Sequence, residues 1–335
     1  MPAIEWDKPR DENQDGVVHV RRGFSTFKME STLGYLLILP ALMWLVALVA
    51  YPFCLSIYFA LSDAVIGAPS KFAGLKNYRE LFTDEIFIQT VKNSFVFTVS
   101  AIFFKTAIGL SLALLLNKNL KFKRVIRGSV LLPWVVPTAL STLGWLWMYD
   151  SLFSVFTWTI NWFLKLQFLK FLGFSPVEIA KLMIKLGLKP LEINWLGDPT
   201  LAMISVIAVN VWRGTPFFAI CILAGLVAIP SGFYEAAEVD GAGTFSKFWH
   251  ITLPMLRPVL AVVLLFSTVF TFAEFNIVFV LTGGGPMNST HLFGTLTHLF
   301  AFTNLQLGKG AAVSLFMFPI LVTVVLLQLR YIRGE

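Results

Sequence analysis

Five polar or charged side chains lie inside the long apolar stretches of this sequence, where they are costly and therefore tend to carry function. They are Lys105, Asn210, Arg213, Glu274 and Asn276. A charge at the middle of a bilayer costs about 2.5–3.5 kcal/mol on an insertion scale, so such residues are expected to face a polar path or one another. We take them as candidates for contact with a polar solute. Interhelical pairing or snorkelling is the alternative interpretation, and we favour it for Lys105 and Arg213.

A cluster of carboxylates, Glu235, Glu238 and Asp240, stands beside an apolar stretch, in the polar segment 230–258. Hydrolysis or group transfer at a membrane edge would need clustered carboxylates or a metal pair, so these residues alone leave a membrane-embedded enzyme open. The four histidines have no acidic or cysteine companions at ligand spacing, and no metal site is expected. The sequence also lacks Gly-x-x-x-x-Gly-Lys-Ser/Thr, which excludes this chain as an ATPase on motif grounds.

The segment 230–258, which we call the elbow, predicts two helices joined by a glycine turn. Ser231 is expected to cap the first helix, in whose first turns the carboxylates complement the helix dipole. Gly241 and Gly243 end that helix, and Thr244 is expected to cap the second. Small residues in the elbow would let another backbone approach closely: Ala236, Ala237, Gly241 and Ala242. The pattern fits a knob that enters a partner's cleft.

The composition is that of a bilayer protein. Of 335 residues, 57% are hydrophobic and only 13% are charged, with a mean hydropathy of +0.76. Soluble domains carry about 25% charged residues. The net charge of +7 is better explained by lysines and arginines at cytoplasmic membrane edges than by nucleic-acid binding. Cys54 and Cys221 lie in apolar stretches and indicate no redox compartment.

Hydropathy predicts an all-α integral membrane fold with six transmembrane helices, since about 20 apolar residues cross the hydrocarbon core. The expected spans are about 33–61, 93–117, 125–149, 200–229, 259–281 and 310–329. A polar tail, 1–30, precedes them, and the first apolar run is expected to be a span rather than a signal peptide. Residues 150–198 are expected to form a long external insertion that holds an interfacial helix with Trp158 and Trp162.

An acid-free basic cluster follows the second span and fixes the expected orientation. It comprises Lys118, Lys121, Lys123, Arg124 and Arg127. By the positive-inside rule this short loop is cytoplasmic. Both chain ends and the elbow are then cytoplasmic as well.

The elbow resembles the signature loop of ATP-binding-cassette importer permeases. The resemblance rests on Glu235-Ala236-Ala237, Gly241 and the ending Ile251-x-Leu253-Pro254, at the family's spacing. Three further stretches resemble the sugar, polyol and glycerol-phosphate subgroup: 72–78, the Leu-Pro-Trp at 132–134, and Thr-Gly-Gly-Gly-Pro at 282–286. Asn276 departs from relatives, which often carry an acid there, and Glu274 could compensate.

The resemblance implies the type I permease fold in a bacterial inner membrane and three kinds of partner. These are a second homologous permease that forms a heterodimer, a pair of ATP-binding subunits that hold ATP and Mg, and an external solute-binding protein. No cofactor is expected in this chain itself. The ATPase-coupling residues would be Glu235, Ala236, Ala237, Asp240 and Gly241. The expected solute-path residues are Asn210, Trp212, Glu274 and Asn276, and Trp212 or Phe272 could stack on a sugar ring.

An ATP-independent secondary transporter or channel is the main alternative. It would need no ATPase partner, and uptake by the chain alone would favour it. A membrane-embedded enzyme is the second alternative, although the elbow pattern already accounts for the carboxylates that it would use.

Overall fold

The computed structural model describes residues 24–118, 121–151, 153–163 and 193–333, with the single positions 173, 175 and 178. The regular secondary structure of these residues is helical, apart from one isolated bridge between Ser62 and Phe72, and turns and loops join the helices. Most of the predicted tail and much of the predicted insertion, including the side chain of Trp162, lie outside the described part. Where the tail is described it is helical, because helix α1 begins at Phe24.

The chain divides into two compact units, Met1–Leu55 and Ser56–Glu335. The first contains α1 (Phe24–Leu45) and a π-helical turn (Val46–Ala50). Helix α2 (Tyr51–Ala60) runs from the first unit into the second. The helical stretch Thr32–Ala60 is long and apolar enough to cross a membrane, close to the predicted first span.

Within the described residues, five helical stretches are long and apolar enough to cross a membrane, or six if the bent pair α5 and α6 counts as one span. They are Thr32–Ala60, Glu85–Asn117, Pro199–Ala228, Thr244–Phe272 and Leu307–Arg330. The number agrees with the six predicted spans. The fourth and sixth begin and end within about three residues of the predicted bounds.

Helix α4 (Glu85–Asn117) begins eight residues before the predicted second span. Asp84 explains the early start, because its side chain accepts hydrogen bonds from the N–H groups of Ile86 and Phe87 at 2.9 and 3.2 Å. A side-chain cap of this kind stabilises a helix N-terminus by about 0.5–2 kcal/mol. The short amphipathic helix α3 (Lys76–Thr83) precedes it.

The predicted third span, 125–149, is not one straight helix. It consists of α5 (Lys123–Val135) and α6 (Thr138–Met148), bent by 89°. Pro137 accounts for the break, because it has no N–H to donate and keeps Val136 in the extended conformation seen here. Helix α7 (Val155–Phe163) follows and carries Trp158, as the predicted interfacial helix would.

The predicted fifth span, 259–281, is displaced and interrupted. Helix α12 (Thr244–Lys247), a π-helical turn (Phe248–Thr252) and α13 (Leu253–Phe272) form one continuous rod, so Pro254 and Pro258 do not end it. Beyond Phe272 a break at 273–275 separates α13 from α14 (Asn276–Leu281). Helix α15 (Phe293–His298), with its π-helical extension (Leu299–Thr303), was not predicted.

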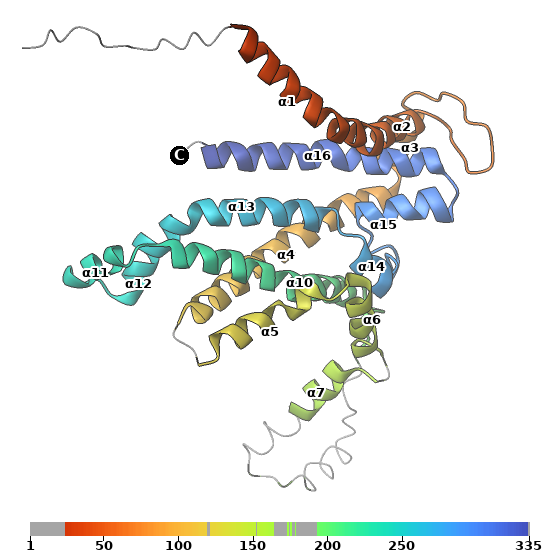
Figure 1. Cartoon of the computed structure of the whole chain (residues 1–335). Helices are drawn as coiled ribbons and strands as arrows, with labels where there is room; N and C mark the ends of the chain where they lie inside the picture. Colours follow the sequence, from red (N-terminus) through yellow and green to blue (C-terminus); the bar gives the residue numbers. More distant parts are fainter. Residues whose placement is uncertain are drawn as a thin grey trace, which may run out of the picture. The chain divides into compact units, whose positions relative to one another are not determined.

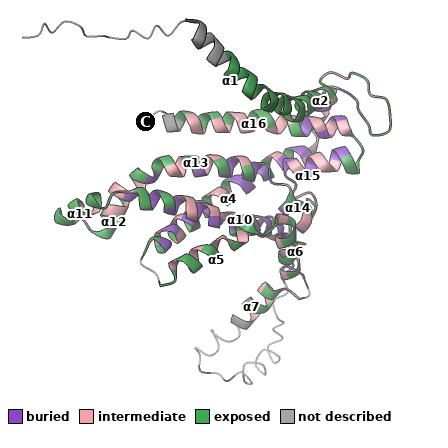
Figure 2. Cartoon of the chain, in the orientation of Figure 1, coloured by how far each residue is buried: buried purple, intermediate pink, exposed green. Residues whose placement is uncertain are grey.

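Helix α10 (Pro199–Ala228) lies at the centre of the second unit, beside α4, α5 and α13 (Figure 1). Buried residues concentrate along α10 and α4 (Figure 2). Two apolar clusters pack along α10, one around Val206 and Val209 and the other around Phe218 and Ile222. A third joins α15 to the last helix, α16 (Leu307–Arg333). Asn210, Arg213 and Thr215 lie on α10 between the first two clusters.

Candidate functional site

A cavity of about 470 Å³ lies between the two apolar clusters on α10. All five intramembrane polar candidates line it, although they come from α4, α10, the 273–275 break and the start of α14: Lys105, Asn210, Arg213, Glu274 and Asn276. The structure thus brings together residues up to 171 positions apart in the sequence. Their convergence makes this cavity the candidate solute site.

Glu274 organises the cavity wall. Its Oε1 accepts hydrogen bonds from the backbone N–H groups of Phe275 and Ile277, each at 3.1 Å, and so caps α14. Its Oε2 accepts a hydrogen bond from Asn210 Nδ2 at 3.1 Å. A buried carboxylate is tolerated when donors satisfy its oxygens, and here the helix break supplies two of them. The interruption of the fifth span is therefore part of the site.

Lys105 crosses from α4 to α13. Its ammonium donates a hydrogen bond to Thr271 Oγ1 at 2.9 Å, and it is within electrostatic range of Glu274 and Arg213. The side chain lies flat against Gly214, where a Cβ would come within 2.6 Å of Lys105 Cε. Interhelical pairing was the favoured interpretation for Lys105, and this bond is of that kind. Lys105 nevertheless lines the cavity.

Two buried polar atoms of the cavity residues lack hydrogen-bond partners among the described residues. They are Arg213 Nε and Asn210 Oδ1. Arg213 forms no ion pair within the described part of the chain either, although it lies near Lys105. Unpaired buried polar groups are rare in folded proteins and call for a ligand, water or other partner. These two atoms give the cavity free donor and acceptor capacity.

Aromatic side chains form the other wall, and the sequence did not single them out as site residues. Trp134 and Phe217 stack with ring centroids 5.7 Å apart and planes at 19°. From the sequence, the Leu-Pro-Trp motif was recognisable only as a family feature, because Trp134 becomes part of the cavity wall only when α5 packs against α10. Phe272, a predicted stacking residue, instead packs in the core with Phe293.

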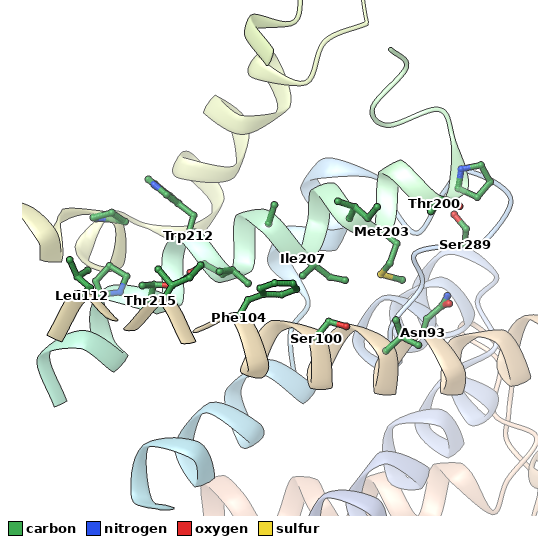
Figure 3. Close-up of a pocket in the computed structure, with 18 of the residues that line it drawn as sticks. Asn93, Ser100, Phe104, Leu112, Thr200, Met203, Ile207, Trp212, Thr215 and Ser289 are labelled. Carbon is green, nitrogen blue, oxygen red and sulfur yellow. The ribbon is translucent and has the colours of Figure 1, made fainter. Parts of the chain in front are cut away.

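Trp212 is separated from the other solute-path candidates. It packs edge-on against Trp145 at 5.3 Å and lines an apolar groove of about 1210 Å³ between α4, α5 and α10. Figure 3 shows side chains of α4 and α10 facing this groove, among them Phe104, Ile207 and Trp212. The polar candidates face the cavity and Trp212 faces the groove, so the two features are distinct.

The elbow consists of two helices, as predicted, but its caps differ from the prediction. Ser231 and Thr244 are the first residues of α11 (Ser231–Val239) and α12, and neither caps a helix with its side chain. Glu238 lies in the last turn of α11 rather than in its first turns. The prediction that its carboxylate complements the positive end of the helix dipole is therefore wrong.

Gly241 makes the elbow turn possible. Its φ is +74°, a left-handed conformation that glycine adopts without cost. The N–H of Gly241 donates to the carbonyl of Glu238 at 3.0 Å, and the N–H of Ala242 donates to that of Ala237 at 2.8 Å. This is the Schellman arrangement, which satisfies the last carbonyls of α11.

Two side-chain contacts hold the elbow helices together. Lys247 Nζ donates to Glu238 Oε1 at 2.8 Å, and Tyr234 Oη lies 3.0 Å from Thr252 Oγ1. The hydrogen bond from Lys247, followed by its positive charge, holds the pKa of Glu238 below its usual range. The elbow is therefore braced at both ends of α11.

The predicted coupling residues lie on the surface of the elbow. Glu235, Ala236, Asp240 and Gly241 are exposed, and Ala237 is half-buried. Large apolar side chains are exposed around them: Phe233, Val239, Phe245 and Trp249. An exposed apolar group at the end of a membrane protein is typical of a protein-docking site.

Comparison with known proteins assigns the chain to a family. The model of the binding-protein-dependent transport system inner membrane component matches residues 105–333. The chain belongs to this family. Membership makes it a multi-pass inner-membrane component of a transport system, and it displaces both the membrane-embedded enzyme and the ATP-independent transporter.

Two curated relatives match nearly the whole chain. The trehalose/maltose transport system permease protein MalF of Thermococcus litoralis is 36% identical, covering 90% of this chain and 94% of that protein. The sulfoquinovosyl glycerol transport system permease protein SmoG of Agrobacterium fabrum is 33% identical, with 90% and 91% covered.

A solved structure shares the fold. A chain of a bacterial ABC transporter involved in the import of the acidic polysaccharide alginate superposes with a TM-score of 0.71 at 19% identity. The match covers 92% of this chain and 98% of that chain. The predicted type I importer permease fold is thus confirmed.

Proposed function

We propose that this chain is one of two permease subunits of an ATP-driven importer of a sugar or sugar derivative. The observation that carries the proposal is the cavity in which five intramembrane polar side chains converge beside an aromatic wall. Sugars offer hydroxyl groups to polar side chains and C–H faces to aromatic rings, and this cavity supplies both partners. The two relatives, a trehalose/maltose and a sulfoquinovosyl glycerol transport system permease protein, support the same class.

Different cavity residues would bind different parts of the solute. Asn210 and Glu274 provide a fixed polar edge, since their mutual hydrogen bond orients both side chains. Asn276 is exposed at the cavity and adds an amide. Trp134 and Phe217 provide the stacking surface. Trp212, predicted from the sequence as a contact, lines the groove and not this cavity.

The elbow transmits force from a separate ATP-binding subunit. The docking face comprises Glu235, Ala236, Asp240 and Gly241, which are exposed, and the half-buried Ala237. The Schellman turn and the Lys247–Glu238 contact make it rigid. The rod Thr244–Phe272 begins in the elbow and ends two residues before Glu274, so movement of the elbow reaches the cavity through one continuous helix. ATP drives the change only insofar as it binds one arrangement of the subunits more tightly than the other.

The remaining partners and the orientation follow from this assignment. An external binding protein delivers the solute, and a second permease subunit completes the path. The elbow, the basic loop after α4 and both chain ends face the cytoplasm. ATP and Mg bind in the ATP-binding subunits, and this chain needs no cofactor of its own.

Uptake into proteoliposomes tests the proposal. The complete transporter, with its binding protein outside and ATP inside, is given radiolabelled maltose or trehalose. We expect ATP-dependent uptake that Trp134→Ala lowers about 2–13-fold, because one aromatic contact contributes about 0.5–1.5 kcal/mol. Trp147→Ala is the matched control, since Trp147 is exposed and lines neither the cavity nor the groove. Uptake without ATP, or equal losses in the two variants, would overturn the proposal.

A further inference from the structure

The charges around the cavity do not balance. Its lining contains two cations, Lys105 and Arg213, and one acid, Glu274. Asn276 faces the same cavity with an uncharged amide. A cavity with one excess positive charge, held among apolar helices, favours a negatively charged ligand group because screening there is weak.

The single acid is already engaged. Both oxygens of Glu274 accept hydrogen bonds, two from the backbone N–H groups of Phe275 and Ile277 and one from Asn210. Lys105 is also committed, because it donates to Thr271 and its stem is pressed against Gly214. The carboxylate of Glu274 and the ammonium of Lys105 are therefore both held in the cavity wall, and their opposite charges offset each other.

Arg213 is the charge left over. It has no acidic partner within the described part of the chain, and its Nε is buried without a hydrogen bond. A guanidinium presents five N–H donors in a flat fork that fits the two oxygens of a carboxylate, sulfonate or phosphate. The free acceptor Asn210 Oδ1 on the same helix can take a neighbouring hydroxyl.

We infer that the solute carries an anionic group and that Arg213 is the residue that selects it. The inference rests on the proposed function, since it assigns the solute class to the same cavity. The aromatic pair Trp134 and Phe217 then holds the uncharged sugar ring while Arg213 binds the acidic substituent. A neutral sugar would leave the guanidinium unpaired, and an unpaired buried donor is costly.

A matched pair of disaccharides tests the inference. Maltitol is neutral, and maltobionate carries a carboxylate where maltitol carries a terminal CH2OH group, with the second unit open-chain in both. Binding of each to the purified complete transporter is followed by tryptophan fluorescence, with Trp134→Phe identifying the part of the signal that comes from the cavity. We expect maltobionate to bind at least tenfold more tightly, which is about 1.4 kcal/mol.

Three variants assign the preference to one residue. Arg213→Gln should abolish it, while Arg213→Lys, which keeps the charge, should retain part of it. Lys92→Gln is the control, because Lys92 is a cation of the groove and not of the cavity. If Arg213→Gln fails to assemble, two measurements on the wild-type transporter still test whether the site selects an anion. These are its preference for maltobionate and the competition of inorganic phosphate with maltobionate.

The outcomes separate the inference from the proposed function. Equal binding of the two sugars with a Trp134 signal would overturn the anionic class and leave the solute site in place. A preference that survives Arg213→Gln would overturn the role of Arg213. Absence of any Trp134 response to either sugar would overturn the solute site as well.

Discussion

Substitution of Gly241 should make the hydrogen bonds of the elbow turn open more often, and the φ angle of this residue determines by how much. A Cβ at this position would meet nothing within 4 Å, so the cost of Gly241→Ala is purely conformational. Holding an L-residue at φ near +74° costs about 1–2 kcal/mol, and a cost of that size shifts an equilibrium about 5–30-fold. The Schellman hydrogen bonds should therefore open about 5–30 times more often than in the wild type.

Hydrogen exchange at the amide of Ala242 measures that opening directly, since this N–H donates to the carbonyl of Ala237. We expect Gly241→Asn to fall between wild type and alanine, because asparagine tolerates the left-handed conformation. Gly243→Ala is the control, with an ordinary φ of −70° and open space around its Cβ. Binding-protein-stimulated ATPase activity should fall in the same order. If Gly241→Ala exchanged at the wild-type rate, or if Gly243→Ala had an equal effect, the left-handed conformation of residue 241 would not be what holds the elbow turn closed.

Three further predictions concern stability and pH. Gly109→Ala should destabilise the solubilised protein by about 1–3 kcal/mol in thermal unfolding, because its Cβ would lie 2.5 Å from Phe218 Cβ, whereas Gly128→Ala in open space should not. Asp84→Ala should cost about 0.5–2 kcal/mol through loss of the α4 cap, and unchanged stability would argue against that cap. The lowered pKa of Glu238 means that its contact with Lys247 stabilises the elbow above the carboxyl's unfolded pKa of about 4.3 and is lost as pH falls through the folded value. Lys247→Met should return the Glu238 pKa to its usual range in an NMR titration, and an unmoved titration would exclude the contact.

The elbow and most of the spans were predictable because their signals are local. The elbow pattern lies within one short polar segment, and hydropathy alone marks a membrane helix. The early start of α4 was missed because the Asp84 cap adds two amphipathic turns before the apolar run begins. Pro137 marks a break in the third span, but a sequence pattern carries no bend angle, and the 89° turn depends on packing.

The break at 273–275 had no local signal, since the stretch Thr271–Asn276 contains neither glycine nor proline. It depends on Glu274, whose carboxylate replaces the lost helical hydrogen bonds and reaches Asn210 on α10. The polar cavity residues were predictable one at a time from the cost of burying them. Their convergence, the aromatic wall and the separation of Trp212 depend on helix packing over long sequence distances.

Cross-linking from the elbow during turnover tests whether the elbow docks on an ATP-binding subunit. A photoreactive residue at position 236, on the exposed face of α11, is activated in the complete transporter while it hydrolyses ATP. We expect a cross-link to the ATP-binding subunit, with a yield that changes between nucleotide states. Cross-links to lipid or to the external binding protein, with none to the ATP-binding subunit, would contradict this expectation.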